Sequence, residues 1–333
     1  MQILPQSEIH SSTDNCSGSG AEEVCGEETV CCGGPPPLKS SPDTRPGYHL
    51  CGFVEGFLQP RLSRIPIVAT SPSATDRIGT LLARLGVNRN RYTVSPGLYG
   101  VGTPDKNSPV IVTANYKLSF DTVRYALSGQ NVWLLVLDTC GINVWCAAGK
   151  GTFSTDELVC QIRQAELEQI VDHRNVIVPQ LGATGIAAHA VKKLCGFSVT
   201  YGPVRAADLT RFISSEYRVE PEMRLATFSL SERTVLIPVE LYLLGSTLWW
   251  LLPLLFIVSG FGPSFYSFGQ AWERGLIITT ATITGICSGA LLLPLLLPYI
   301  PGKSFALKGL FTGILCGYGL ISTLSASISL YDS

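Results

Sequence analysis

Two neighbouring stretches decide the fold expected for this chain: Val132-Trp133-Leu134-Leu135-Val136-Leu137-Asp138 (132–138) and Asn143-Val144-Trp145-Cys146-Ala147-Ala148-Gly149-Lys150 (143–150). The first is a short, continuous apolar run, which is typical of a strand covered on both faces. The second opens with Asn143, a residue type favoured at helix N-caps, so Cys146 falls in the first turn of the helix. The pair predicts a strand, a loop and a helix that carries a cysteine near its start.

The same alternation of strand and helix continues on both sides of this unit. Strand-like runs fall at 109–115, 131–138, 175–179 and 197–201, and helical patterns fall at 119–128, 154–172, 184–195 and 206–216. Ser154-Thr155-Asp156-Glu157 has capping-box spacing, Ser119 is expected to cap its helix, and Gly196 is well placed to end another. Alternating units of this length predict an α/β domain with a doubly wound, Rossmann-like parallel sheet.

Parallel sheets of this kind bind ligands beyond the carboxyl ends of their strands. Four separate loops follow the predicted strands, and we expect them to meet at one edge of the sheet. The candidate ligand-binding residues in and after these strand ends are Thr113, Asn115, Asp138, Asn143, Val144, Trp145, Cys146, Ala147, Ala148, Gly149, Lys150, Gln180, Gly182, Ala183, Thr184, Gly185, Tyr201, Gly202 and Pro203.

Composition separates the chain into a soluble part and an apolar part. Of the 333 residues, 15% are charged and the formal net charge is −1, so no broad basic surface indicates a nucleic-acid partner. After residue 233 the ionisable acids and bases are reduced to Glu240, Glu273, Arg274, Lys303, Lys308 and Asp332. Residues 46–232 are expected to form the ligand-binding domain, preceded by a disordered Cys/Gly/Pro-rich tail over 1–45.

The apolar part, 233–333, has three stretches long enough to cross a bilayer, at about 236–259, 275–300 and 307–330. We predict a transmembrane domain of about three helices, and the alternative is a buried helical core. Because the first 30 residues lack a secretory signal, we place the α/β domain in the cytoplasm and the chain in the inner (cytoplasmic) membrane as a multi-pass protein. Lys303 and Lys308, beside the second loop, agree with this orientation, whereas the first loop is expected to carry Glu273 and Arg274.

The chain has eleven cysteines, which in a cytoplasmic protein are expected to be reduced thiols. Those near the N-terminus lie in a Gly/Ser/Pro-rich setting without C-x-x-C spacing: Cys16, Cys25, Cys31, Cys32 and Cys51. A mobile thiol-rich tail is the preferred interpretation. A metal site, or a segment that holds a thiophilic metal ion for the active site, stays open as an alternative.

Two nucleotide-binding interpretations of the central motif fail on specific residues. A nicotinamide fold needs G-x-G-x-x-G after the first strand, but 112–120 contains no glycine. A phosphate-binding P-loop needs Gly-Lys followed by Ser or Thr, but Gly151 follows Lys150. Cysteine-nucleophile hydrolysis needs a histidine base near Cys146, and neither His173 nor His189 is expected on a strand-end loop.

Cys146 can also be interpreted as a small buried hydrophobe, as we do for Cys140, Cys160 and Cys195. Ligand binding stays open beside this interpretation, because Ala147, Ala148 and Gly149 are expected to leave a bare helix face that a large flat ligand could approach. Other candidates keep two interpretations. Thr113 and Asn115 bind ligand or satisfy backbone groups at the strand end, Gly182 and Gly185 bind ligand or serve as turn residues, and Lys150 contacts ligand or faces solvent.

The string NVWCAAGK (143–150) resembles the cap-helix signature of the mercury-methylating corrinoid protein family. Further segments resemble that family's soluble domain in the same order: CCGGPPP (31–37), RPGYHLCGFVEGF (45–57), SPGLYGVG (95–102), PVIVTANYKLSFD (109–121), PQLGATG (179–185) and GFSVTYGPVRAADL (196–209). A weaker similarity, over about 95–215, relates the chain to the corrinoid-binding domain of the corrinoid/iron–sulfur protein large subunit. Members usually have about five membrane helices, so a C-terminal truncation is expected.

The resemblance implies a cobalamin-like corrinoid cofactor, with the Cys146 thiolate as lower axial ligand of cobalt. It implies methyl transfer from methyl-cobalt(III) to mercury(II), giving methylmercury, since a thiolate donates electron density more strongly than a nitrogen ligand. The implied partners are a ferredoxin-like [4Fe–4S] electron donor and a folate-linked methyltransferase as methyl donor. The alternative function is a membrane-anchored corrinoid carrier that passes methyl groups to another enzyme of one-carbon metabolism.

Overall fold

The computed structural model describes residues 52–58, 65–227, 229–263 and 265–331. They divide into two compact units. The first unit comprises the described residues up to Gly79 together with Asn90–Ala226, and the second comprises Thr80–Arg89 together with the chain from Thr227 onward. The N-terminal cysteines named above and the segment 1–45 lie outside the described residues.

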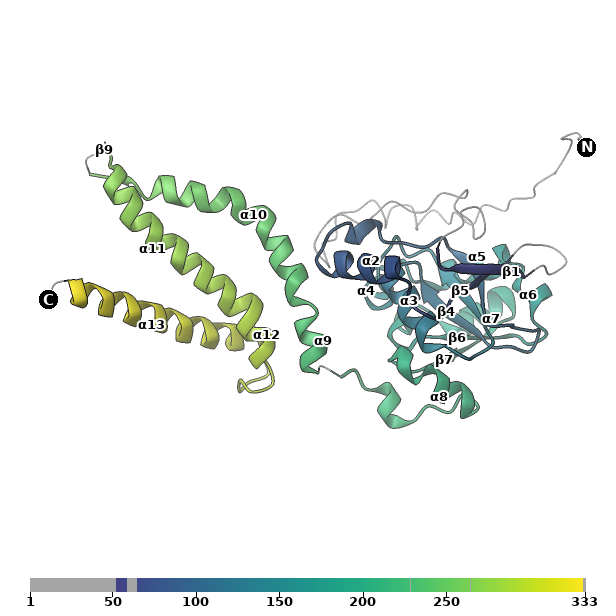
Figure 1. The fold of residues 1–333 in the computed structure, drawn as a ribbon. Helices are drawn as coiled ribbons and strands as arrows, with labels where there is room; N and C mark the ends of the chain where they lie inside the picture. The colour runs from purple at the N-terminus through teal and green to yellow at the C-terminus, as the bar shows by residue number, and fades with distance from the viewer. Residues whose placement is uncertain (1–51, 59–64, 228, 264, 332–333) are drawn as a thin grey trace, which may run out of the picture. The chain divides into compact units, whose positions relative to one another are not determined.

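The elements up to residue 226 alternate between strands and helices (Figure 1). They are β1 (Val54–Leu58), β2 (Ile65–Val68), α2 (Ala74–Arg84), η2 (Arg89–Arg91), β3 (Gly97–Val101), β4 (Val110–Ala114), α3 (Lys117–Ala126), β5 (Val132–Leu137), α4 (Val144–Lys150), α5 (Thr155–Gln164), α6 (Leu167–Ile170), β6 (Asn175–Val178), η3 (Gln180–Gly182), α7 (Ala188–Cys195), β7 (Ser198–Tyr201), η4 (Ala206–Asp208), α8 (Leu209–Ser214) and η5 (Pro221–Arg224).

Within the described residues, β1 to β7 form one sheet in the order β1-β2-β3-β5-β4-β6-β7. β4 pairs in parallel with both β5 and β6, and β6 pairs in parallel with β7. These four strands are the ones expected from the sequence, and their ends differ from the predicted bounds by at most one residue. The predicted α/β class with parallel-rich pairing is therefore confirmed.

The prediction of a wholly parallel sheet was wrong for the remaining strands. β3 is antiparallel to β5, with Tyr99 opposite Leu134, and β1 is antiparallel to β2. The sequence pattern concealed these strands because glycine is depleted in strands, and 95–102 contains three. Gly100 lies in close packing: a Cβ there would lie 3.2 Å from Leu58 Cδ1 and 3.3 Å from Pro104 Cγ, which is tighter than ordinary contact.

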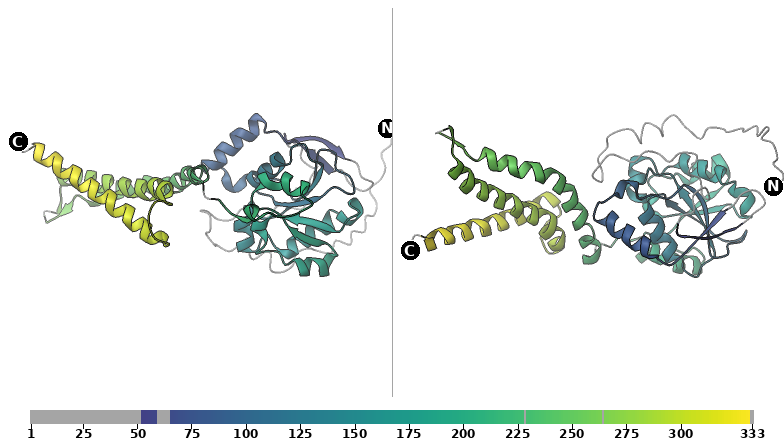
Figure 2. Two further views of the ribbon diagram at one scale, coloured as in Figure 1. Left: turned by 90° about the horizontal axis from the view of Figure 1, so that it is seen from below. Right: turned by 45° about the horizontal axis from the view of Figure 1, so that its top comes forward.

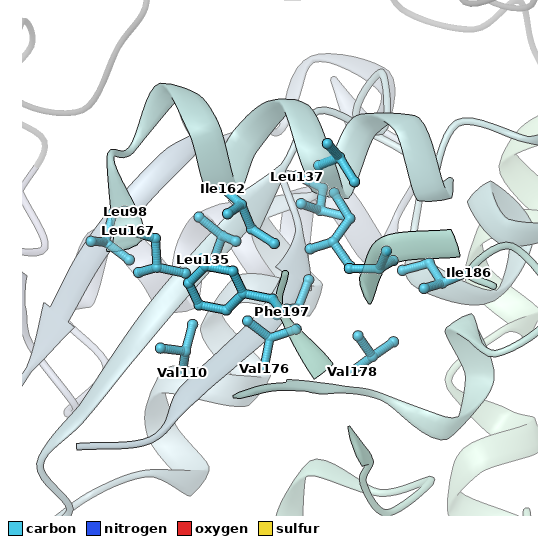
Figure 3. Packing of buried hydrophobic residues seen from close by; sticks show 14 of the residues in the cluster. Leu98, Val110, Leu135, Leu137, Ile162, Leu167, Val176, Val178, Ile186 and Phe197 are labelled. Atoms are coloured by element: carbon cyan, nitrogen blue, oxygen red, sulfur yellow. The ribbon is translucent and has the colours of Figure 1, made fainter. Parts of the chain in front are cut away.

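Helices cover both faces of the sheet, and each face has its own hydrophobic core. On one face, Leu158 and Ile162 of α5 and Val191 of α7 pack with β4, β5 and β6. Figure 3 shows the ring of Phe197 in this cluster among Val110, Leu135 and Val176. On the other face, the core comprises residues of α3 and α8 with the same strands: Phe120, Leu127, Ile111, Leu134, Val136, Ile177, Leu209 and Phe212 among them.

Two local expectations were wrong at helix ends. Ser119 does not cap α3, because the helix begins two residues earlier, at Lys117, after the N-cap Tyr116. The helix expected over 154–172 is broken between α5 and α6 where Glu166 adopts a left-handed φ of 47°. The cap at Ser154, whose side chain accepts from Glu157 N at 3.2 Å, and the end of α7 at Gly196, with φ of 77°, are confirmed.

A buried charge cluster joins the start of α2 to α3. Lys117 Nζ lies 2.8 Å from Asp76 Oδ1 and 2.7 Å from Asp121 Oδ2, while Arg124 bonds both carboxylates and donates to the Ala69 carbonyl. The Arg124 side chain is fully buried. Burial by itself would raise the pKa of Asp76, but hydrogen bonds from Lys117 and Arg124 outweigh it and hold that pKa below its usual range.

From residue 227 onward the chain is almost entirely helical. The elements are α9 (Leu230–Thr234), α10 (Ile237–Val258), β8 (Phe261–Gly262), β9 (Phe265–Tyr266), α11 (Phe268–Ile286), the π-helical segment η6 (Cys287–Leu292), α12 (Leu293–Leu296) and α13 (Phe305–Tyr331). Two helices among the described residues are long and apolar enough to cross a membrane, Phe268–Leu296 and Phe305–Thr323.

A third span would require the bent pair Leu230–Gly245 and Thr247–Val258, whose axes differ by 51° (Figures 1 and 2). The first predicted stretch, 236–259, is therefore not one straight helix; the break falls at Gly245, a residue type that accompanies helix kinks. The expected first loop was also wrong in detail, because Glu273 and Arg274 lie within α11 and β8–β9 form the turn instead.

We expect Asp76→Asn to lower the free energy of unfolding by about 3–5 kcal/mol, because it leaves two buried cations with one carboxylate. Since the pKa of Asp76 is lowered on folding, its stabilisation is fully present above the usual aspartate pKa of about 3.9 and is lost as the pH falls below that value. Denaturant titration between pH 7 and about pH 3 checks both statements.

The matched control is Asp172→Asn, which removes an exposed ion pair with Lys106 at 3.7 Å. Exposed pairs contribute about 0–1 kcal/mol, so this variant should unfold nearly like the wild type. Equal losses in the two variants would contradict the assignment of the cluster as a stabilising element.

Candidate functional site

The segments that follow β4, β5, β6 and β7 meet around one pocket of about 400 Å³. Thr113 comes from β4, Asn143–Trp145 from the start of α4, Pro179 and Leu181 from the segment after β6, and Gly202–Val204 from the segment after β7. After β4 the chain turns to α3 on one face, and after the neighbouring β6 it turns to α7 on the other. The pocket thus lies where chain directions diverge, the usual ligand position in such sheets.

Cys146 lies in the first turn of α4, beside this pocket. Asn143 is the N-cap of the helix, and its Oδ1 accepts a hydrogen bond from Cys146 N at 2.9 Å. The helix ends after Lys150, where Gly151 has a left-handed φ of 80°. The predicted helix and its cap are confirmed, and they fix the backbone of the cysteine relative to β5.

One side of α4 is open. Trp145 is 66% exposed and Cys146 is half-buried. Gly149, one turn after Trp145, is exposed, and a Cβ built on it would meet no atom within 4 Å. The exposed face of α4, defined by Trp145, Cys146 and Gly149, therefore offers uncovered backbone and one sulfur atom.

Ala147 and Ala148 do not belong to this exposed face, which corrects the sequence-based expectation of a bare surface made by all three small residues. Ala147 is fully buried and Ala148 is 7% exposed, and both pack in the core on the α5 side of the sheet. The helical period explains the difference, because residues 147 and 148 point away from the side that carries Trp145 and Gly149. Their small size brings α4 close to the sheet.

Asn115 and Asp138 hold the loop that leads to α4 and are not among the residues that line the pocket. Asn115 Nδ2 donates to Asp138 Oδ1 at 2.9 Å, and Asn115 Oδ1 accepts from the backbone N–H groups of Thr139 and Gly141 at 3.1 and 3.0 Å. Asp138 Oδ1 also accepts from Cys140 N at 3.1 Å. Of the two interpretations given for Asn115, satisfaction of backbone groups at the strand end is the one that its contacts support.

Cys140, with φ of 54°, and Gly141, with φ of 70°, adopt left-handed conformations in this loop. For a non-glycine residue this conformation is uncommon and costs free energy. The bonds to Asn115 and Asp138 stabilise it. Cys140 is also disulfide-bonded, which corrects its interpretation as a reduced thiol that acts as a small buried hydrophobe. Glu157 of α5 adds a further anchor, since its Oε1 accepts from Asp138 N at 2.9 Å.

Two of the five candidates after β6, Gly182 and Gly185, pack closely against Phe153 or α4. A Cβ on Gly182 would lie 2.4 Å from Phe153 Cε1, and one on Gly185 would lie 2.0 Å from the Phe153 carbonyl oxygen and 3.2 Å from Ala148 Cα. Only glycine fits these positions, so both have a packing role. Of the neighbouring candidates, Ala183 is half-buried and Thr184 is exposed.

Of the remaining candidates, some bond to other parts of the protein and others line the pocket. Tyr201 OH donates to the Ile186 carbonyl at 2.7 Å, and Gln180 Oε1 lies 3.4 Å from Arg224 Nη1. Lys150 is half-buried in the last turn of α4. Gly202 and Pro203 line the pocket, and a Cβ on Gly202 would approach Ile177 Cγ2 to 3.1 Å.

Thr113 is the polar residue of the pocket wall that most needs a partner. Its Oγ1 is buried and has no hydrogen-bond partner among the described residues. A buried hydroxyl without a partner costs free energy, so this atom is a candidate polar contact for a ligand.

Sequence reasoning selected Thr113 but missed the apolar residues of the pocket wall, including Leu181 and Val204, because apolar residues next to a strand normally belong to the core. Their nearness in sequence to Gln180 and Pro203 is the signal that could have found them.

The geometry gives no support to cysteine-nucleophile hydrolysis with His173. That ring lies before β6, at the opposite edge of the sheet, with Nε2 2.9 Å from the Ser108 carbonyl and Nδ1 accepting from Asn175 N at 3.3 Å. His189 is exposed on α7. Within the described residues, no three His, Cys, Asp or Glu side chains are placed to hold a metal ion.

Comparison with known proteins finds one matching family and several similar proteins. Residues 83–213 match the family described as CO dehydrogenase/acetyl-CoA synthase delta subunit. The acetyl-CoA decarbonylase/synthase complex subunit gamma of Methanopyrus kandleri is 33% identical over 130 residues, which cover 38% of this chain and 28% of that protein. The subunit of the same name from Methanocaldococcus jannaschii is 40% identical over 98 residues, covering 29% and 20%.

The corrinoid/iron-sulfur protein large subunit of Moorella thermoacetica is 29% identical over 147 residues, or 41% of this chain and 32% of that protein. The chain thus spans less than a third of the length of each of these relatives. The segment 83–213 contains β3 to β7 and α4. The family match therefore covers the residues that build the pocket, and the chain is also similar to a corrinoid/iron-sulfur protein and to subunits of acetyl-CoA decarbonylase/synthase complexes.

Two glycine substitutions distinguish the packed side of α4 from its exposed face. We expect Gly185→Ala to lower the free energy of unfolding by about 1–3 kcal/mol or more, because the new Cβ overlaps backbone atoms. Gly149→Ala should instead raise it by about 0.5–1 kcal/mol, since alanine is favoured within a helix and meets open space. Thermal or denaturant unfolding measures both, and a destabilised Gly149→Ala would show that this face is covered.

Proposed function

We propose that the α/β unit binds a corrinoid against the exposed face of α4 and that the chain carries methyl groups in one-carbon metabolism. Two findings support this most directly: residues 83–213, which contain the pocket and α4, match the CO dehydrogenase/acetyl-CoA synthase delta subunit family, and the chain is similar to a corrinoid/iron-sulfur protein and to acetyl-CoA decarbonylase/synthase subunits. When bound, a corrinoid supplies a cobalt centre that accepts and releases methyl groups.

The residues present fit such a group. A corrinoid is a large, flat macrocycle, and the exposed face of α4 presents bare backbone at Gly149, where even an added Cβ would have no atom near it. Cobalt is already held by the macrocycle nitrogens, so the protein needs to add a single axial donor, which Cys146 can be. The adjacent pocket is within the usual size range for ligand sites and provides the buried Thr113 hydroxyl as a polar contact.

Each residue then has a defined role. Cys146 would supply a sulfur donor to the cobalt of the bound corrinoid, and Asn143 fixes the turn that carries it. Asn115, Asp138 and Glu157 act through the 138–143 loop and are positioning residues. Trp145 offers an apolar ring beside the sulfur, and Thr113, Gly202 and Pro203 line the neighbouring pocket.

A second candidate function is transfer of the methyl group to inorganic mercury(II) as substrate. The specific observation in its favour is the NVWCAAGK sequence, which the structure folds as N-cap plus helix with Cys146 in the first turn. Mercury(II) is an electrophile, and a thiolate donor such as Cys146 would supply more electron density to a methyl-carrying cobalt than a nitrogen donor would. The relatives support methyl carriage in general and do not bear on mercury.

The proposal requires partners. The chain has no C-x-x-C-x-x-C segment to hold an iron–sulfur cluster, so we propose a ferredoxin-like [4Fe–4S] protein as electron donor and a folate-linked methyltransferase as methyl donor.

We further propose a Rossmann-like arrangement for the α/β unit. We also propose that α10, α11 with α12, and α13 anchor the chain in the cytoplasmic membrane, with the α/β unit in the cytoplasm. Length and apolar composition of the helices support this anchoring.

The axial ligand can be tested by absorption spectroscopy of the anaerobically purified full chain. We expect bands of a sulfur-ligated corrinoid in the wild type, loss of those bands in Cys146→Ala, and a nitrogen-ligated spectrum in Cys146→His. The control is Cys195→Ala, which removes a thiol from α7 that donates to the Val191 carbonyl at 3.3 Å. An unchanged spectrum in Cys146→Ala would rule out this ligand.

The methyl acceptor can be tested separately with the purified chain, a ferredoxin partner as electron donor, a folate-linked methyltransferase with its methyl-folate as methyl source, and mercury(II). Mercury methylation predicts methylmercury with the wild type, none with Cys146→Ala, and a strongly reduced rate with Cys146→His, because a nitrogen ligand donates less charge. If the wild type forms no methylmercury but passes its methyl group to a corrinoid-dependent acceptor enzyme, the carrier function is correct and the mercury function is wrong.

A further inference from the structure

A second pocket, of about 880 Å³, lies within the helical unit between α9, α10, the α11–α12 helix and the start of α13. Its wall is mainly apolar, with Leu244, Ile286 and Leu293 among the lining residues. Gly285 and Gly289 line it one helical turn apart, and a Cβ on either would meet no atom within 4 Å. The pocket is thus an apolar groove, and it is deep at these two positions because glycine has no side chain to fill it.

Four charged residues line the same pocket: Arg233, Glu240, Lys303 and Lys308. Three are cations and one is an acid, so their formal charges sum to +2. Among the residues that the structure describes, no ion pair joins Glu240 to Lys303 or Lys308. An apolar groove with a net positive lining complements a ligand that is apolar in one part and anionic in another.

The end of α12 explains how two of these cations are held. Pro298 lacks an N–H group, so the carbonyl of Pro294, four residues earlier, has no helical donor. The carbonyls of Leu295 and Leu297 lie at the end of α12, where the last carbonyls of a helix lack helical donors. Arg233 Nη1 donates to the Pro294 and Leu295 carbonyls at 2.8 and 2.9 Å, and Lys308 Nζ donates to the Leu297 carbonyl at 2.7 Å. These acceptors are neutral, so both side chains are positioned while their positive charges are retained.

We propose that this pocket binds an anionic phospholipid, with the phosphodiester at Arg233, Lys303 and Lys308 and an acyl chain along Gly285 and Gly289. The inference rests on the proposed membrane placement of these helices and is independent of the corrinoid. A lipid is the occupant that combines both required chemistries at a membrane surface. Juxtamembrane cations and basic pockets between membrane helices favour anionic headgroups for the same electrostatic reason.

The test uses the full chain in nanodiscs of phosphatidylcholine with phosphatidylglycerol as the minor lipid, followed by mass spectrometry of the lipids retained after transfer to detergent. We expect phosphatidylglycerol to be enriched in the wild type. Lys308→Gln should reduce the enrichment about fivefold, the effect of one cation near a lipid headgroup. Lys308→Arg keeps the charge and should retain it, which separates loss of charge from misfolding.

Gly289→Leu keeps every charge but fills the groove, so it should abolish retention of the lipid. The control is Arg274→Gln, which removes an exposed cation that does not line the pocket and should change nothing. A wild type that retains both lipids equally, or an equal loss in the Arg274 variant, would overturn the proposal. Displacement of the lipid by inorganic phosphate would also overturn it, since the site would then recognise phosphate alone.

The corrinoid spectrum of the same samples distinguishes the two proposals. Phosphatidylglycerol enrichment without a corrinoid spectrum would leave the lipid site standing while the proposed function fails. A corrinoid spectrum without lipid enrichment would give the opposite result. Release of the chain from membranes by alkaline carbonate would remove the membrane placement, and the lipid site with it.

Discussion

The arrangement of the candidate site depends on one buried side chain, Asn115, at the end of β4. Its amide nitrogen bonds Asp138 and its oxygen accepts from the backbone of Thr139 and Gly141, so it closes the strand-end loop that leads to Asn143 and Cys146. Each such bond contributes about 1 kcal/mol net, but an unsatisfied buried group would cost about 1–3 kcal/mol. Removing Asn115 would orphan several groups together, in a loop that already contains the left-handed Cys140. The position of the sulfur is therefore set by polar contacts beneath α4 and not by the helix alone.

Much of the α/β fold could be predicted because its core strands are short, continuous apolar runs separated by helices with good caps. β4 to β7 follow directly from that pattern, as does the α4 cap at Asn143. The pattern could not reveal β1 to β3, whose residues include several glycines, nor the antiparallel pairing of β3 with β5, which is a long-range property. The break at Glu166 is likewise not visible in apolar periodicity, because the positions on both sides of it are compatible with one helix.

The candidate site was predictable at the level of topology and only partly at the level of residues. Topology brings the four strand ends together, and the pocket at that edge follows from it. Assigning a role to each residue needs side-chain direction, which sequence spacing does not fix. Ala147 and Ala148 face the core, and Gly182 and Gly185 are small because Phe153 and α4 approach them. These residues are needed for the site without lining it, whereas apolar residues such as Val204 line it without any chemical signal in the sequence.

The same physical constraint, backbone groups left without their usual partners, organises both units. In the α/β unit, loop N–H groups at the end of β5 are satisfied by the carboxylate of Asp138 and the amide of Asn115. In the helical unit, carbonyls at the end of α12, where Pro298 removes one N–H donor, are satisfied by Arg233 and Lys308. The chemical consequences differ. A neutral amide that meets N–H groups builds a rigid support, whereas a cation that meets neutral carbonyls remains charged and can still attract an anion. This difference is why the first network acts by positioning Cys146 and the second is a candidate for binding a ligand itself.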